Sequence, residues 1–254
     1  MNNPRVSIIT SLYKGDDHIK EFLDNMVSQT YFDRCELVIV DGASPDNERS
    51  TIEEYMEKHN NISYHRLDVD PGIYGCWNKA IEHSSGEYIT NANLDDRRSN
   101  IQIEEFVKEM DESPDIDLIY SYCFVTNKPH EDFNNNSSGN KVYPTYSFTR
   151  ENMLKCLPGC MPLWRRSMHN GIGFFNENYI SAGDWEMWLR AVRNGSSFKM
   201  KKEALGLYYM NPTGVSTNFE NEAERFKEEK EVFWEYTDIF GLDVTNRYRE
   251  YFSK

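Results

Sequence analysis

Short apolar runs alternate with amphipathic segments along the first half of the chain. The runs Val6–Thr10 and Glu36–Val40 are rich in β-branched residues, which is typical of buried strands. Between them, Asp17–Gln29 places its apolar residues on one helical face. The same alternation continues to about residue 125, with further strands predicted at 62–66, in the first half of 87–94 and at 117–125, and further helices at 50–59, 73–83 and 101–112.

Strands that alternate with helices in this way indicate one fold class. A strand followed by a helix and another strand forms a parallel pair with a right-handed crossover. We therefore expect an α/β fold with a mostly parallel central sheet that is flanked by helices. Neither an internal repeat nor a clean linker interrupts the pattern, so a single domain over residues 1–254 is the prediction.

The second half of the chain changes character. Residues 128–148 are polar and include an asparagine-rich run, which predicts either a mobile loop over a site or a surface insertion. A helix is predicted at Trp185–Arg193. From Phe219 to Phe240, apolar residues recur at helical spacing opposite a face dense in Glu and Lys. This predicts one amphipathic terminal helix that packs on the domain, while docking to a membrane or a partner is the alternative.

Composition narrows the classes of protein that remain. A hydrophobic fraction of 39% and an aromatic fraction of 14% favour a packed core. The 42 acidic residues exceed the 28 basic ones and give a formal charge of -14, which argues against a protein that tracks a nucleic-acid backbone. The local pair Arg165-Arg166 leaves contact with an anionic substrate open.

The sequence also bears on location. No apolar run is long enough for a transmembrane helix, and the first residues lack the apolar core of a signal peptide. The five cysteines are an odd number without a C-x-x-C pair, which favours free thiols in a reducing compartment. We therefore expect a cytoplasmic protein, and contact with the inner face of the membrane through the terminal helix stays open.

Acidic residues follow two of the predicted strands. Asp95 and Asp96 come directly after the strand near residue 90, and Asp41 ends the strand that begins at Glu36. In an open α/β sheet, ligands bind at the carboxyl ends of the strands. Adjacent carboxylates there favour Mg²⁺ or Mn²⁺, which completes its coordination with substrate phosphate. Asp41 suits a nucleobase imide or a ribose hydroxyl, although a capped turn is an equal alternative for it alone.

A third acidic residue, Asp184, precedes or opens the helix predicted near Trp185. It suits the N-terminal end of that helix, where the dipole favours a carboxylate. Beside two tryptophans, its carboxyl is also placed to have a raised pKa, as a general base near neutral pH requires. Trp185 is either a stacking face for a sugar ring or a core residue, whereas Trp188 is expected in the core.

Several motifs of other enzyme classes are missing from the sequence. It contains neither a Gly-x-Ser-x-Gly elbow nor a P-loop nor a Gly-x-Gly-x-x-Gly pattern. A serine hydrolase and a dinucleotide-dependent oxidoreductase are therefore poor candidates.

Seven groups of residues follow one another in a recognisable order: VSIITSLY at 6–13, SQTY at 28–31, ELVIVDGASPD at 36–46, DPGIYGCWNKAI at 70–81, NLDD at 93–96, GCMPLWR at 159–165 with GFFNE at 173–177, and DWEMWLR at 184–190. Taken in order, from about Arg5 to about Ser216, they resemble the motifs of the family 2 glycosyltransferases, which have the GT-A fold. No single motif is decisive, but the ordered set is specific.

The resemblance implies a role for each matching residue. Asp184 falls at the catalytic base, Asp96 at the direct metal ligand, and Asp95 at a ribose contact or a second metal contact. The implied nucleotide contacts are Ser11, Tyr13, Asp41, Asp70, Asn78 and Asp95, and the implied contacts to acceptor or donor sugar are Trp164 and Trp185. Residues of about 1–125 would then form the nucleotide-binding half, about 126–216 the acceptor-side half, and 217–254 a helical extension.

Three positions depart from the family pattern. Asn93 stands at the first acidic position of the D-x-D motif, and Gly183 replaces the glutamate of the Glu-Asp motif. Asn211 stands where many members carry a histidine that reaches the metal. The protein's contribution to a metal site therefore rests on Asp95 and Asp96.

The resemblance implies an inverting enzyme that uses Mn²⁺ or Mg²⁺. It would move a sugar from a nucleotide-sugar, most simply a UDP-sugar, to a hydroxyl of a glycan, lipid-linked or glycoprotein acceptor, as in polysaccharide biosynthesis. The alternatives are a nucleotidyltransferase that acts on a sugar phosphate and a non-catalytic member that binds a glycan or a partner. The sequence leaves a homodimer open.

Overall fold

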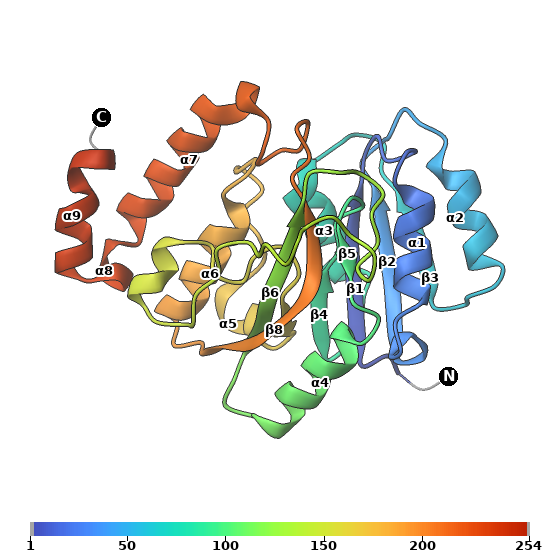
Figure 1. Ribbon diagram of the computed structural model, residues 1–254, viewed down its shortest axis with the longest axis horizontal. Helices are drawn as coiled ribbons and strands as arrows, with labels where there is room; N and C mark the ends of the chain where they lie inside the picture. Colours follow the sequence, from blue (N-terminus) through green and yellow to red (C-terminus); the bar gives the residue numbers. More distant parts are fainter. Residues whose placement is uncertain (1–2, 253–254) are drawn as a thin grey trace.

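A mixed eight-stranded sheet forms the centre of the molecule. The computed structural model describes residues 3–252, so both extreme ends of the predicted domain, 1–2 and 253–254, lie outside the described residues. The strands stand in the order β3-β2-β1-β4-β7-β6-β8-β5 (Figure 1). Their bounds are β1 Val6–Leu12, β2 Cys35–Asp41, β3 Ile62–Arg66, β4 Tyr88–Asn91, β5 Arg97–Arg98, β6 Leu118–Thr126, β7 Leu163–Arg165 and β8 Phe198–Tyr209.

The first half of the sheet is parallel, as predicted. β1 pairs in parallel with β2 on one side and with β4 on the other, and β2 pairs with β3. Side chains alternate between the two faces of each strand. Ile8 and Leu37 therefore belong to one apolar cluster and Ile9 and Val38 to the other. Both faces are buried, which explains why these strands read as continuous apolar runs.

The second half of the sheet contains elements that the pattern did not predict. The short strand β7 runs antiparallel to both β4 and β6 and joins the two halves. The long strand β8 is parallel to β6, with register shifts near Tyr122, and its far end pairs with β5. β8 was missed because its first half is lysine-rich and partly exposed, so it lacks the apolar run of a buried strand.

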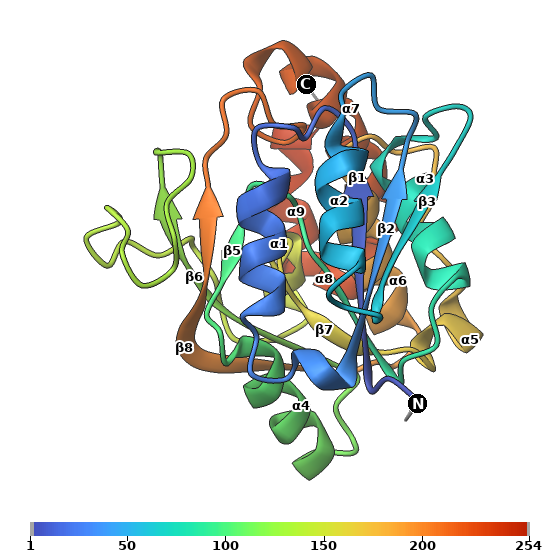
Figure 2. The same cartoon turned by 90° about the vertical axis from the view of Figure 1, so that its right-hand side faces the viewer.

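Helices cover both faces of the sheet. In Figure 2, α1 and α2 lie side by side on the face of the sheet that is turned toward the viewer. The cluster on this side contains side chains of α1, α2 and α4, whereas the opposite cluster contains those of α3, α6, α7 and α8. The helix bounds are α1 Ile19–Val27, α2 Glu48–Met56, α3 Gly72–Glu82, α4 Gln102–Glu112, α5 Met168–Ile172, α6 Gly183–Arg193, α7 Glu222–Glu235, α8 Thr237–Phe240 and α9 Leu242–Phe252.

The C-terminal segment differs from the single helix predicted for it. α7 ends at Glu235, and Gly241, with a φ of 81°, separates α8 from α9. Val232 and Phe233 are buried in the main cluster, so the segment does pack on the domain. No helix within residues 3–252 is both long and apolar enough to cross a membrane.

Candidate functional site

The three predicted acidic positions Asp41, Asp95 and Asp96 follow strands that end at the same edge of the sheet. Asp41 ends β2 and lies opposite Leu12 of β1, while Asn91 ends β4 and lies opposite Ile9. Neighbouring strands are about 4.8 Å apart, so β2 and β4 are separated by about 10 Å. A nucleoside diphosphate would span this distance. The edge therefore has the dimensions of a nucleotide site.

Asp41 is 1% exposed and holds the turn that follows β2. Its carboxylate accepts a hydrogen bond of 2.6 Å from the backbone N–H of Ser44 and another from the hydroxyl of Tyr64. The guanidinium of Arg66 pairs with it at 2.5 Å. A carboxylate has about four lone-pair sites, so one remains for a ligand. Turn capping and ligand binding thus coexist at this residue.

The residues around Asp41 lie at the part of the sheet edge where contacts to the nucleobase are predicted. A side chain at Gly42 would come within 2.7 Å of Asp70 Oδ1, so Asp70 occupies the space that this glycine leaves open. Asp70 itself is exposed and accepts the N–H of Gly72 at 2.8 Å. On β1, Ser11 is hydrogen-bonded to the thiol of Cys76, and Tyr13 beyond it is 46% exposed. These groups lie near the ends of β1 and β2, where the nucleotide contacts are predicted.

The carboxylates of Asp95 and Asp96 receive hydrogen bonds from neutral groups. Asp96 is 3% exposed and accepts from the backbone N–H of Tyr209 at 3.1 Å and from Asn93 Nδ2 at 3.2 Å. Asp95 accepts from Asn211 Nδ2 at 2.9 Å. Burial raises the pKa of Asp96 well above its ordinary value, and the charge of Asp95 raises it further. A cation beside the pair would relieve both effects.

The donor set of this pair fits a hard divalent cation. Carboxylate and amide oxygens are the ligands that Mg²⁺ and Mn²⁺ prefer. Across residues 3–252, however, no three His, Cys, Asp or Glu side chains gather to hold a metal. The protein would therefore supply few ligands, and a diphosphate would have to complete the coordination. Asn211 has turned its amide nitrogen toward Asp95, which leaves its oxygen for Thr213 at 2.9 Å.

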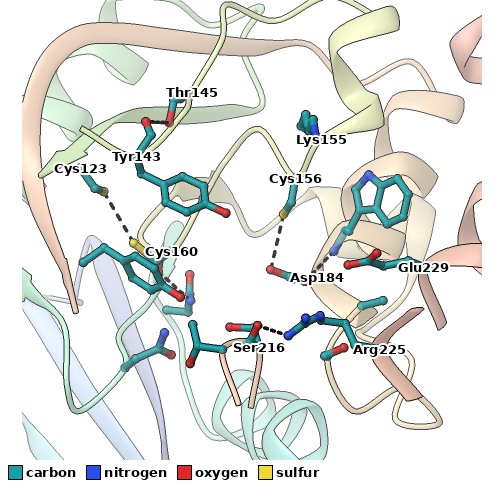
Figure 3. Close-up of a pocket in the computed structure, with 18 of the residues that line it drawn as sticks. Cys123, Tyr143, Thr145, Lys155, Cys156, Cys160, Asp184, Ser216, Arg225 and Glu229 are labelled. Carbon is teal, nitrogen blue, oxygen red and sulfur yellow. Dashed lines mark hydrogen bonds between the residues drawn. The ribbon is translucent and has the colours of Figure 1, made fainter. Parts of the chain in front are cut away.

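A cavity of about 580 Å³ extends from Asn93, a hydrogen-bond partner of Asp96, to Asp184. Asn91 and Asn93 line the cavity together with Asp184 and Trp185. Figure 3 shows Asp184 at this cavity beside Cys156. Asn93 is the residue that donates to Asp96, so the cavity begins one hydrogen bond away from the predicted metal ligand. The other lining residues include Trp77, Ser121, Cys123, Tyr143, Thr145, Cys156, Cys160, Tyr208, Ser216, Thr217, Arg225, Glu229 and Tyr248.

Asp184 lies in the first turn of α6 and presents one oxygen for chemistry. Its Oδ1 accepts the N–H of Trp185 at 2.8 Å and the hydroxyl of Tyr74 at 3.3 Å. Its Oδ2 contacts the thiol of Cys156 at 3.5 Å, which is a weak hydrogen bond, so this oxygen retains accepting capacity. Burial raises the pKa of the Asp184 carboxyl, although the three hydrogen bonds oppose that rise. A carboxyl in this state is suited to take a proton near neutral pH.

Two residues of the predicted site have other roles in the structure. Trp164 has no exposed surface, donates its indole N–H to His169 at 3.0 Å and contacts Trp188, so its predicted sugar contact is corrected to a core position. Asn78 donates to the carbonyl of Phe175 at 2.9 Å and accepts its N–H at 3.0 Å. Its side chain therefore anchors that segment, and this replaces the predicted nucleotide contact.

The second tryptophan, Trp185, is mostly core. It is 7% exposed and donates its indole N–H to the carbonyl of Met153 at 2.7 Å. Its remaining surface borders the cavity beside Asp184, so a sugar contact at the ring edge stays a prediction. Trp188, expected in the core, is 2% exposed and is confirmed there.

The sequence did not predict the residues that the C-terminal helices bring to the cavity. Arg225 and Glu229 of α7 and Tyr248 of α9 line it, although the pattern marked this region only as an amphipathic extension. Lys155 and Tyr143 reach the cavity from the long segment between β6 and β7. The one available signal was the spacing of Arg225 and Glu229, which puts two charges on the same helical face.

Comparison with known proteins agrees with the fold and the motifs. The model of "Glycosyl transferase family 2" matches residues 7–173. The putative teichuronic acid biosynthesis glycosyltransferase TuaG of Bacillus subtilis is 23% identical over 94% of this chain and 90% of its own. TarS 1–349 of S. aureus in complex with UDP-GlcNAc superposes with a TM-score of 0.75 at 19% identity, covering 96% of this chain and 72% of that one.

A second solved structure carries a metal. The mannosyltransferase PcManGT from Pyrobaculum calidifontis, in complex with GDP-Man and Mn²⁺, has a TM-score of 0.66 at 20% identity and covers 91% of this chain and 62% of that one. At these identities the structural matches show the shared fold. The family match spans well over half of the chain, and the protein therefore belongs to glycosyl transferase family 2, a family of transferases with the GT-A fold.

Proposed function

We propose that this glycosyltransferase moves a sugar from a UDP-sugar to an acceptor hydroxyl with inversion at the anomeric carbon. The observation that carries the proposal is the single cavity that runs from Asn93, the hydrogen-bond partner of Asp96, to Asp184. A donor diphosphate at one end and an acceptor hydroxyl at the other would place the anomeric carbon between them. Complexes of structural neighbours with UDP-GlcNAc and with GDP-Man support a nucleotide-sugar donor.

Asp184 acts as the general base in this proposal. Its Oδ2 accepts the proton of the acceptor hydroxyl while the acceptor oxygen forms a bond to the anomeric carbon. The bond from that carbon to the diphosphate breaks, and its electron pair leaves with the nucleotide. Attack from the face opposite the leaving group inverts the configuration. The Trp185 N–H and the Tyr74 hydroxyl on Oδ1 orient the carboxylate for this transfer.

Asp95 and Asp96 would hold a divalent cation, Mn²⁺ or Mg²⁺. When bound, it would supply the positive charge that stabilises a departing diphosphate. The buried carboxylate of Asp96, which accepts hydrogen bonds from the backbone N–H of Tyr209 and from Asn93 Nδ2, both neutral donors, is suited to that ion. On the nucleotide side, Asp41, Asp70, Ser11 and Tyr13 are the proposed contacts to base and ribose.

Two alternatives remain distinguishable by experiment. A nucleotidyltransferase needs a loop that holds a triphosphate, but the loop after β1 offers only Lys14 and Gly15 for this purpose. A non-catalytic binder would not need a buried carboxyl with a raised pKa at Asp184. We also propose that the acceptor is a glycan or is lipid-linked. Peripheral contact of the protein with a membrane and its dimerisation are further parts of this proposal.

The test is to incubate the purified protein with a panel of UDP- and GDP-sugars, with Mn²⁺ or with a chelator. We expect metal-dependent release of UDP, first as slow donor hydrolysis and faster with a glycan acceptor. NMR of the product should show an inverted anomeric centre. Pyrophosphate release from UTP and a sugar phosphate would instead establish nucleotidyl transfer, and the absence of any donor turnover or binding would establish a non-catalytic role.

A further inference from the structure

Helix α7 presents two charged side chains to the cavity. Arg225 and Glu229 are four residues apart, so they lie on the same helical face. The neighbouring Glu228 points elsewhere: it is 4% exposed and accepts the backbone N–H groups of Ile180, Ser181 and Ala182. Glu228 thus ties α7 to the start of α6, the helix that carries Asp184. Figure 3 shows Arg225 and Glu229 near Asp184 at the cavity.

Glu229 is held at the cavity without a strong partner of its own. The side chain is half-buried, and burial raises its pKa, while the charges of Arg225 and Lys155 oppose that rise. Arg225 lines the cavity and uses Nη1 to donate to the carbonyl of Ser216, which is another lining residue. A carboxylate and a guanidinium in this arrangement offer hydrogen-bond acceptors and donors side by side.

The charges that line the cavity cancel. Among the described lining residues, Lys155 and Arg225 are cationic, and Asp184 and Glu229 are anionic. Beside Asp184 and Glu229, an anionic acceptor group would meet two carboxylates, and the lining offers it no excess of positive charge. The formal charge of -14 on the whole chain further disfavours a polyanion. An uncharged polar ligand has no such conflict.

We propose that Arg225 and Glu229 bind the acceptor, and that the group they bind is an uncharged sugar residue through two neighbouring hydroxyls. Glu229 accepts from these hydroxyls and Arg225 donates to one of them. Tyr143 and Tyr248, which also line the cavity, offer ring surface to the sugar, and Ser216 and Thr217 offer further hydroxyls. This inference rests on the proposed glycosyl transfer, because it assigns the acceptor for which Asp184 is the base.

The test separates acceptor binding from catalysis. Binding of methyl glycosides of neutral hexoses, hexuronic acids and hexose phosphates is measured by saturation-transfer NMR in the absence of donor. The proteins are the wild type, Glu229→Gln, and the control Glu231→Gln, which makes the same change on an exposed position of α7. UDP binding with Mn²⁺ and the unfolding temperature are recorded for all three.

We expect a neutral glycoside to bind the wild type, and the Glu229→Gln variant to bind it about tenfold more weakly, since a hydrogen bond to a charged group is lost. The control variant should match the wild type, and UDP binding should not change. Equal binding to Glu229→Gln and wild type, a preference for the charged glycosides, or no binding of any neutral glycoside would overturn the inference. Retained glycoside binding in a protein that turns over no UDP-sugar would refute the proposed function instead.

Discussion

The substitution Asp184→Asn tests the proposed chemistry directly. The amide oxygen of Asn can keep the hydrogen bonds from the Trp185 N–H and the Tyr74 hydroxyl, so the first turn of α6 should be preserved. What is lost is the basic oxygen beside Cys156. General-base assistance contributes about 10²–10⁴-fold, which corresponds to about 3–5 kcal/mol of transition-state stabilisation. We therefore expect kcat to fall by that factor while UDP affinity stays unchanged.

The pH dependence gives a second readout for the same residue. Asp184 must be ionised to accept a proton, and burial raises its pKa. Activity should therefore be lost, as pH falls, at a higher pH than for an ordinary carboxyl, and this acid limb should be absent from the residual activity of Asp184→Asn. Ionisation of Asp184 is needed for activity but lowers the free energy of unfolding. A raised pKa in the folded state makes ionisation costly, so the variant should be more stable than the wild type above that pKa.

The assay is UDP release at saturating donor and Mn²⁺ over a series of pH values, with calorimetric titration of UDP and chemical unfolding on the same samples. Asp115→Asn is the matched control, because it makes the same chemical change on an exposed loop residue. If Asp184→Asn kept turnover within about threefold of the wild type, well below the range for a general base, the reasoning would be refuted. A loss of UDP affinity equal to the loss of turnover would point to a collapsed site.

Three further substitutions test neighbouring features. Cys156→Ala removes the thiol that donates to Asp184, so the pKa of that carboxyl should rise further and the acid limb of the rate profile should move to higher pH; an unmoved limb would contradict this contact. Asp96→Asn should abolish the extra thermal stabilisation by UDP that depends on Mn²⁺, which reaches about 2.7 kcal/mol at 100 Kd. An undiminished metal effect would exclude Asp96 as a ligand. Glu228→Gln should lower the free energy of unfolding by about 2 kcal/mol, because charged hydrogen bonds to three backbone N–H groups are weakened. Urea denaturation measures this loss of stability, and an unchanged midpoint would argue against a stabilising role for the hydrogen bonds of Glu228.

The parallel half of the fold was predictable from sequence because both of its faces are buried. Continuous apolar runs such as those of β1 and β2 arise only from that environment, and the acidic residues after them mark the strand ends. β8 was not predictable in the same way, because its lysines reach the surface and pair with Glu105 and Glu109 of α4. Its pairing depends on a distant strand rather than on local pattern.

Residues of the candidate site were predictable only where the neighbouring sequence marks their position in the fold. Asp184 and the pair Asp95-Asp96 stand at element ends, a position that sequence reveals. Trp164 was misassigned because sequence alone does not distinguish a tryptophan in the core from one in a sugar site. Its packing against Trp188 shows that it belongs to the core. Arg225 and Glu229 were missed because their spacing shows only that they share a helical face, whereas their place at the cavity depends on how α7 docks.

The tie from Glu228 to the start of α6 has a consequence for how this protein can be shortened. The family match ends at residue 173, before the proposed base Asp184 and before the helix that carries Glu228. A truncation at that boundary would discard Asp184 itself. A truncation after α6 would leave the backbone N–H groups of Ile180, Ser181 and Ala182 without the Glu228 carboxylate that accepts their hydrogen bonds. The smallest autonomous enzyme must therefore extend through α7, and insertions or fusions are better tolerated in the exposed asparagine-rich loop than anywhere between residues 180 and 235.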